Sequence, residues 1–191
     1  MTLRFTLLVT FIIFATAAWS WCGPHRDRYE TAPYKVVSTD GKVEIREYPP
    51  LKLVTAKMGE AKDNEANRSF RSLFAYISGE NAASSKIAMT TPVFMDESNM
   101  SFVLPEDVTE SGAPSPTGTA VALTQFAGGR FAVLRFKGSR SDRAEENAEA
   151  ALRAWAAAKK LRITGSAMFA YYDPPFTLPP LRRNEVLLAI E

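Results

Sequence analysis

The sequence has very few of the side chains that most often carry catalysis and bind metals, with one cysteine and one histidine in 191 residues. A single cysteine, Cys22, excludes an intramolecular disulfide and a multi-cysteine zinc site. Cys22 also lacks the second cysteine of a c-type haem attachment motif. The only histidine, His25, precedes every predicted element of the fold. Histidine is the commonest general acid–base. Because the predicted domain contains none, a Ser-His-Asp or Cys-His arrangement inside it is excluded.

The chain also lacks an excess of charge of either sign. Lys and Arg number 23 against 21 Asp and Glu, which gives a net charge of +2, and no long basic run occurs. A basic footprint for nucleic acid is therefore absent. Gly128-Gly129 is not followed by the Lys-Ser/Thr of a phosphate-binding loop. The carboxylates are scattered in a way that is typical of solvated faces, so we expect neither a catalytic nor a metal site.

The N-terminus predicts export. Arg4 precedes an uncharged, mostly apolar run at 5–19, which is shorter than the roughly 20 residues of a membrane-spanning helix. Ala18 and Ser20 are small residues at the two positions that a signal peptidase reads. We expect residues 1–20 to be a signal peptide and the protein to be periplasmic or secreted. Two alternatives stay open: an uncleaved membrane anchor, and a lipoprotein attached through Cys22, which the bulky Trp21 disfavours.

Residues 21–33 are predicted to be a linker and residues 34–191 a single domain. The domain contains one pattern twice, namely a strand, a helix and two more strands. The first copy spans 51–104, with helix positions Ala66, Phe70, Leu73, Phe74 and Ile77 in helical spacing, and the second spans 131–190. Between the copies, residues 105–119 are rich in Pro and Gly and predict a surface linker.

Two short turns predict further strand pairs. Asp40-Gly41 joins strands at 34–38 and 43–47, and Gly128-Gly129 is predicted to join a hairpin of 121–126 with 131–136. Asp142, with Glu145 three residues later, predicts a capping box at the start of the second helix, near 141–160. The duplication predicts an α+β fold in which β-α-β-β units form an antiparallel sheet with two helices packed on it.

Three motifs in a fixed order carry a family resemblance. They are Val-Glu-Ile-Arg-Glu-Tyr-Pro at 43–49, Lys-Ile-Ala-Met-Thr-Thr-Pro-Val at 86–93, and Tyr-Asp-Pro-Pro-Phe at 172–176, which is followed by Arg-Arg-Asn-Glu-Val at 182–186. From about Tyr34 to Ile190 the chain resembles the SOUL family of haem-binding proteins. The resemblance implies a curved, barrel-like antiparallel sheet flanked by two helices, and a tetrapyrrole binder rather than an enzyme.

The resemblance also implies where the ligand binds, namely on the first helix and on the loop after Tyr172. The family's apolar helix contacts are methionines that match Phe70 and Phe74 here, and its helix arginine falls nearest Asn67, so propionate pairing is expected from neighbouring cations. With no histidine in the domain, contact with haem or porphyrin is expected to be chiefly hydrophobic, or else the iron ligand is expected to be a tyrosine or a methionine. The expected ligand-binding residues are Arg68, Phe70, Arg71, Phe74, Phe176, Leu178, Arg182 and Arg183.

An alternative remains open at this point. The same residues are compatible with core packing of the helix and with arginines that simply flank a strand. A SOUL-fold module that holds another apolar ligand or a protein partner, without haem, is the second hypothesis, and an enzyme is the third. We expect no nucleic-acid partner, and a membrane contact only if the N-terminal segment is an uncleaved anchor.

Overall fold

The computed structural model of the chain describes residues 29–59 and 62–191. The predicted signal peptide and its cleavage site, together with Cys22 and His25, lie outside the described residues. The predicted linker is described from Tyr29 onward. There a short strand, β1 (Glu30–Thr31), pairs in parallel with β5 (Thr90–Thr91).

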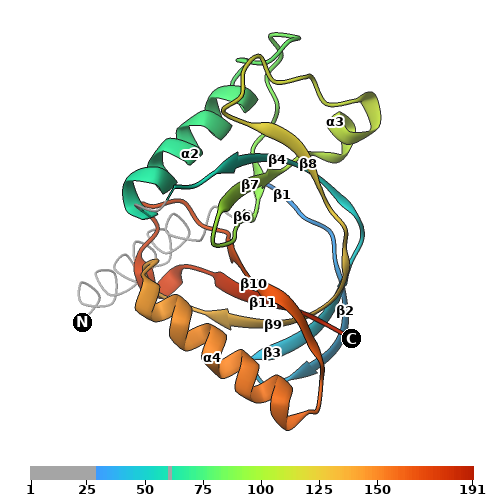
Figure 1. Cartoon of the computed structure of the whole chain (residues 1–191), viewed down its shortest axis with the longest axis vertical. Helices are drawn as coiled ribbons and strands as arrows, with labels where there is room; N and C mark the ends of the chain where they lie inside the picture. Colours follow the sequence, from blue (N-terminus) through green and yellow to red (C-terminus); the bar gives the residue numbers. More distant parts are fainter. Residues whose placement is uncertain (1–28, 60–61) are drawn as a thin grey trace, which may run out of the picture.

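A nine-stranded antiparallel sheet forms the body of the domain (Figure 1). It curves strongly but does not close, and β2 and β8 form its two edges. This confirms the predicted α+β class with a curved antiparallel sheet. The strands, in spatial order, are β2 (Lys35–Asp40), β3 (Val43–Tyr48), β9 (Gly129–Phe136), β11 (Asn184–Ile190), β10 (Ile163–Tyr171), β6 (Val93–Met95), β7 (Asn99–Val103), β4 (Leu51–Lys57) and β8 (Ala122–Phe126).

Two long helices pack on the outer side of the curved sheet, one on each half. Helix α2 (Lys62–Ile77) lies on β4 and β7, and α4 (Asp142–Ala158) lies on β9, β10 and β11. The units β4-α2-β6-β7 and β9-α4-β10-β11 therefore repeat, as the sequence pattern predicts. They meet at the centre of the sheet, where β6 pairs with β10.

The predicted hairpin around Gly128-Gly129 is wrong. Strand β8 pairs with β4 of the first half, while β9 pairs with β3 and β11. The strand that precedes each repeat therefore pairs within the other half of the sheet. Strand β3, which lies beside β9, continues into β4 across the molecule, and β8, which lies beside β4, continues into β9. The two connections touch: a Cβ placed on Gly128, whose φ is +76°, would lie 2.5 Å from the carbonyl oxygen of Tyr48. Glycine is needed there for this close approach, not for a two-residue turn.

Alternation along the strands divides the core into three clusters. One fills the inside of the curve, with Phe94, Val133 and Leu187 among its residues. The other two lie between the sheet and α2, around Leu73, and between the sheet and α4, around Leu152. The helices thus bury only the sides that face the sheet, and their flanks and outer faces remain available to contact a ligand.

Two smaller expectations need adjustment. The predicted surface linker at 105–119 contains a short helix, α3 (Glu106–Ser111). The N-cap of α4 is Ser141, whose hydroxyl accepts from the backbone N–H of Ala144, and not the predicted Asp142. Since Ser141 is as good a capping residue as Asp, residue type alone does not fix the boundary.

Candidate ligand-binding surfaces

An exposed aromatic face lies on the flank of α2 that borders β7. The side chains of Phe70 and Phe74 are 39% and 50% exposed. Their rings are nearly parallel, at an interplanar angle of 11° with centroids 6.2 Å apart. Phe70 is anchored by an edge-on contact with Phe102 of β7, 5.3 Å between centroids. Helical spacing predicts that both phenylalanines share a side, but only the structure shows that this side is open at its edge.

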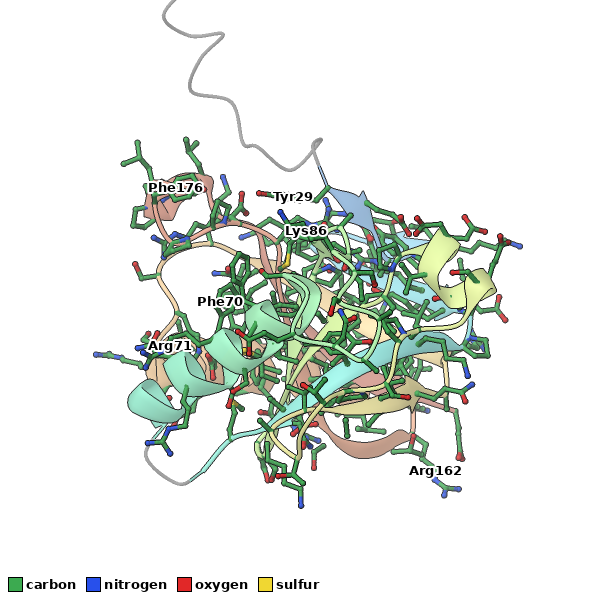
Figure 2. The ribbon with its side chains drawn as sticks, turned by 90° about the horizontal axis from the view of Figure 1, so that it is seen from above. Tyr29, Phe70, Arg71, Lys86, Arg162 and Phe176 are labelled. Carbon is green, nitrogen blue, oxygen red and sulfur yellow. The ribbon has the colours of Figure 1, made fainter. Side chains whose placement is uncertain are left out.

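The loop between β10 and β11 carries the second set of expected residues. Phe176 and Leu178 are 73% and 58% exposed, and Figure 2 shows Phe176 at the outer tip of the loop, away from Phe70 and Arg71 on α2. The loop is held from within, since Arg182 donates to the carbonyl oxygens of Thr177 and Pro175. A short 3₁₀ turn, η2 (Pro179–Leu181), completes it.

The neck of this loop is fixed by hydrogen bonds between its two ends. The backbone N–H of Arg183 donates to Asp173 Oδ2 at 2.6 Å, and the backbone N–H of Tyr172 donates to the carbonyl oxygen of Arg183 at 3.3 Å. The guanidinium of Arg183 lies 3.9 Å over the ring of Tyr172. The structure therefore uses Arg182 and Arg183 to shape the loop, a role that their position in the sequence does not reveal.

A buried carboxylate ties the loop to the sheet. Glu185 of β11 is fully buried and accepts two hydrogen bonds from Arg46 of β3, at 2.7 and 2.9 Å. It also accepts from Arg183 at 2.8 Å, from Arg135 at 3.1 Å and from the Tyr172 hydroxyl at 3.0 Å. Arg46 is equally buried. This network joins β3, β9, β11 and the loop.

The charges in this network shift each other's pKa values. Burial opposes the ionisation of Glu185, but Arg46 and Arg183 more than offset it, so the pKa of this carboxyl is lowered. Burial also opposes the charge on Arg46, yet Glu185 raises the pKa of its guanidinium. Tyr48, which accepts a hydrogen bond from Arg46, has its pKa raised to about 12, mainly by burial. All members therefore keep their ordinary charge near neutral pH, and the cluster is structural.

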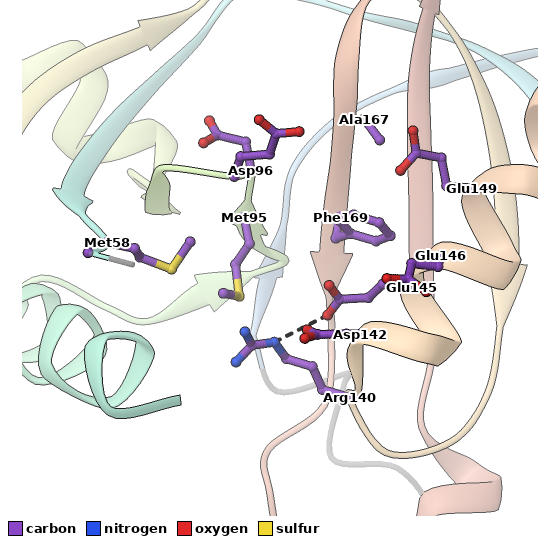
Figure 3. Close-up of a pocket in the computed structure, with 12 residues that line it drawn as sticks. Met58, Met95, Asp96, Arg140, Asp142, Glu145, Glu146, Glu149, Ala167 and Phe169 are labelled. Carbon is purple, nitrogen blue, oxygen red and sulfur yellow. Dashed lines mark hydrogen bonds and ion pairs between the residues drawn. The ribbon is translucent and has the colours of Figure 1, made fainter. Parts of the chain in front are cut away.

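An acidic groove lies between α4 and the turn that joins β6 to β7, beside the junction of β6 and β10 (Figure 3). Its volume is about 220 Å³, and Met58, Met95 and Phe169 form its apolar part. Glu145 accepts hydrogen bonds from the Tyr171 hydroxyl and from Arg140 Nε. Burial first, and the hydrogen bond to Glu145 second, raise the pKa of Tyr171. The carboxylates that line the groove are Asp96, Glu97, Asp142, Glu145, Glu146 and Glu149.

A larger and basic groove lies on the other flank of α4. Its volume is about 880 Å³, and its apolar part includes Leu134 and Phe136 of β9. Among the described residues that line it there is neither Asp nor Glu, whereas there are five cations: Lys42, Arg135, Lys137, Arg182 and Arg183. The sequence does not indicate this groove, because its cations come from three separate segments that only the sheet register brings together.

The expected site residues therefore lie on two surfaces. Arg68, Phe70, Arg71 and Phe74 share α2, and both arginines are exposed. Phe176 and Leu178 project from the loop, while Arg182 and Arg183 border the basic groove. Within residues 29–59 and 62–191, no group of three or more His, Cys, Asp or Glu side chains is placed to hold a metal ion. No helix in the same residues is long and apolar enough to cross a membrane.

Solved structures support the fold. The C-terminal domain of EcmrR has a TM-score of 0.58 at 13% identity, covering 83% of this chain and 98% of that domain. A hydrolase from Listeria innocua has a TM-score of 0.56 at 14% identity, covering 81% of this chain and 94% of that protein. Identities this low show a shared fold and not a shared activity.

The sequence itself identifies the family. No curated protein matches the chain. The family model described as SOUL heme-binding protein matches residues 29–189, which is nearly all of the part that the structure describes. The three ordered motifs lie in the same region: β3 carries the first, the second leads into β6, and the third forms the loop neck and β11. The chain belongs to the SOUL family of haem-binding proteins.

Proposed function

We propose that this protein binds haem or a related tetrapyrrole without catalysing a reaction, on the aromatic face of α2. The observation that carries the proposal is the parallel, exposed pair of Phe70 and Phe74. A planar macrocycle is a suitable partner for such rings, because aromatic stacking adds about 0.5–1.5 kcal/mol per pair to the burial of apolar area. The exposed Phe176 and Leu178 lie on the separate loop between β10 and β11, so the proposed contact rests on α2 alone.

Charge favours this face over the acidic groove beside α4. Haem carries two anionic propionates, which the carboxylates of the acidic groove repel. Arg68 and Arg71 lie on the exposed side of α2, where they would meet propionates at the edge of the macrocycle. Exposed ion pairs contribute only about 0–1 kcal/mol each, so most of the affinity comes from apolar contact.

The chemistry of the aromatic face predicts that its affinity for a tetrapyrrole depends little on whether the macrocycle contains iron. The chain's one histidine and one cysteine both precede the described residues, and the residues of the proposed face, Arg68, Phe70, Arg71 and Phe74, include no iron ligand. A site without an axial ligand holds the macrocycle through its plane and edges, so iron-free protoporphyrin should bind within about threefold of hemin. We expect His25→Ala to leave hemin binding nearly unchanged, and a lost Soret shift in that variant would instead make the N-terminal segment an axial-ligand arm.

A second candidate function is a SOUL-fold module for a different apolar ligand or a protein partner. The observation that favours it is the internal use of Arg182 and Arg183, which leaves fewer cations for propionates than the family resemblance implies. A hemin titration that produces no Soret shift, in protein that melts cooperatively, would favour this second function.

We also propose that the protein works outside the cytoplasm, on the strength of its N-terminal sequence alone. The expected mature chain begins at Trp21. Intact-mass measurement of periplasmic protein tests this: a mass that retains residues 1–20 would indicate an anchor, and an acylated Cys22 would indicate a lipoprotein.

The function is tested by titrating hemin and protoporphyrin into purified protein and into Phe74→Ala. We expect both ligands to bind the wild type and to lose about tenfold in affinity in the variant, which corresponds to about 1.4 kcal/mol. A protein that binds neither ligand would remove the proposal.

A further inference from the structure

The basic groove beside α4 has the form of a trench with an apolar floor. Ala148 and Ala151 stand on the flank of α4 that faces it, and Leu134 and Phe136 line it from β9. Because these alanine side chains are small, they leave the space between α4 and β9 open. Along α4 the lining runs from Ala144 to Ala151, about 10 Å at 1.5 Å per residue.

Positive charge gathers at one end of this trench. Lys42 immediately precedes β3 and Lys137 immediately follows β9. Because Val43 pairs with Leu134 in antiparallel register, these two lysines lie at the same end of the strand pair. The end of the loop, at Leu181–Arg183, borders the groove as well.

The two lysines differ from the arginines nearby. Arg135 binds Glu44 and Glu185, Arg183 binds Glu185, and Arg182 binds loop carbonyls. In the part of the chain that the structure describes, Lys42 and Lys137 make no ion pair, and both are exposed. They can therefore bind an external anion without breaking an internal contact.

The two flanks of α4 have opposite character. Glu145 and Glu149 face the acidic groove on one side, whereas no carboxylate of residues 29–59 and 62–191 lines the trench on the other. A ligand with a negative group is therefore directed to the trench and away from the acidic groove.

We propose that this trench binds a single-chain amphipathic carboxylate, with its carboxylate between Lys42 and Lys137 and its alkyl chain along the alanine stripe of α4. One charged end and one long apolar floor fit a ligand with one head and one tail. The proposal does not rest on tetrapyrrole binding, because neither Phe70 nor Phe74 lines the trench.

Calorimetric titration with decanoate, decanol and decyltrimethylammonium tests the proposal. We expect decanoate to bind about tenfold more tightly than the uncharged alcohol, and the cation not to bind. Decanoate affinity should fall as salt is raised. The double change Lys42→Gln with Lys137→Gln should lower decanoate affinity to that of decanol and leave decanol unchanged. Equal affinities for decanoate and decanol in the wild type would overturn the assignment of the head group.

A matched pair of variants tests the location. Ala151→Phe fills the trench from an exposed helix position, while Ala150→Phe places the same side chain on the exposed face of α4 outside it. Decanoate binding should be lost in the first variant and kept in the second. Equal binding by both would overturn the site.

Hemin titration separates this site from the tetrapyrrole site. Ala151→Phe should bind hemin like the wild type, and Phe74→Ala should bind decanoate like the wild type. If hemin displaces decanoate competitively, the single-chain assignment is wrong and the trench is the tetrapyrrole site instead.

Discussion

Replacing Glu185 by Gln is expected to destabilise the fold more than any other change from a charged to a neutral isostere on the described strands. Glu185 accepts five hydrogen bonds, from Arg46, Arg135, Arg183 and Tyr172, and is fully buried. The amide keeps the volume of the side chain but removes the negative charge. It also turns one acceptor into a donor that points at guanidinium groups, which cannot accept.

The magnitude follows from the burial of the partners. Removing one member of a buried ion pair costs about 3–5 kcal/mol, because the remaining charge stays buried without compensation. Arg46 is as buried as Glu185, and among the described carboxylates it retains only Glu44 as a partner. We therefore expect Glu185→Gln to lower the free energy of unfolding by about 3–5 kcal/mol. The control is Glu149→Gln, which breaks a partly exposed pair with Arg153 on α4 and should cost about 0.5 kcal/mol or less.

Urea unfolding at several pH values measures this and checks its cause. The pKa of Glu185 is lowered by folding from about 4.3 in an unfolded chain. Its contribution is therefore fully present above the unfolded pKa and is lost as pH falls through the folded pKa. The stability difference between wild type and Glu185→Gln should be constant from pH 6 to pH 8 and shrink below about pH 4. A loss under 1 kcal/mol, or a difference that stays constant down to the acid transition, would refute the assignment of Glu185 as an ionised hub.

Two further predictions concern packing. Gly128→Ala should lower the free energy of unfolding by about 2 kcal/mol or more, because its new Cβ meets backbone at 2.5 Å. Gly41→Ala, with a φ of +60° and nothing within 4 Å, should lower it by only about 1 kcal/mol in thermal or urea melts. Equal losses would mean that the two crossing connections can move apart. Leu73→Ala, in the closed core under α2, should cost about 2–5 kcal/mol, while the half-exposed Phe74→Ala should cost about 1–2 kcal/mol. If Phe74→Ala proved as costly as Leu73→Ala, Phe74 would be a core residue and the proposed face would be closed.

The repeat of strand, helix and two strands could be predicted from the sequence, because helical and alternating apolar spacing directly reflect which sides are buried. The strand exchange could not. Gly128-Gly129 between two strand patterns is a good hairpin signal, and only long-range pairing with β4 and β3 reveals that the strands part there. Local turn chemistry cannot report which strand lies beside which.

The candidate site was predictable in residue type and only partly in geometry. Helical spacing places Phe70 and Phe74 on one side of α2. How exposed they are depends on how α2 sits on the sheet beside β7, which the spacing does not reveal. Glu185 and Arg46 look like alternate polar positions of two ordinary strands. Their burial arises because the sheet curves and turns those positions inward, where the two residues meet across β9.

Tetrapyrrole binding on the aromatic face of α2 is tested most sharply by the Soret-band titration of hemin into wild type, Phe74→Ala and Val37→Ala. Val37 lies on the edge strand β2 and is 47% exposed, so its variant controls for hemin that adheres to exposed apolar residues. We expect saturable binding to the wild type and to Val37→Ala, with about tenfold weaker binding to Phe74→Ala. Equal affinity in all three proteins, or no saturable binding to the wild type, would contradict it.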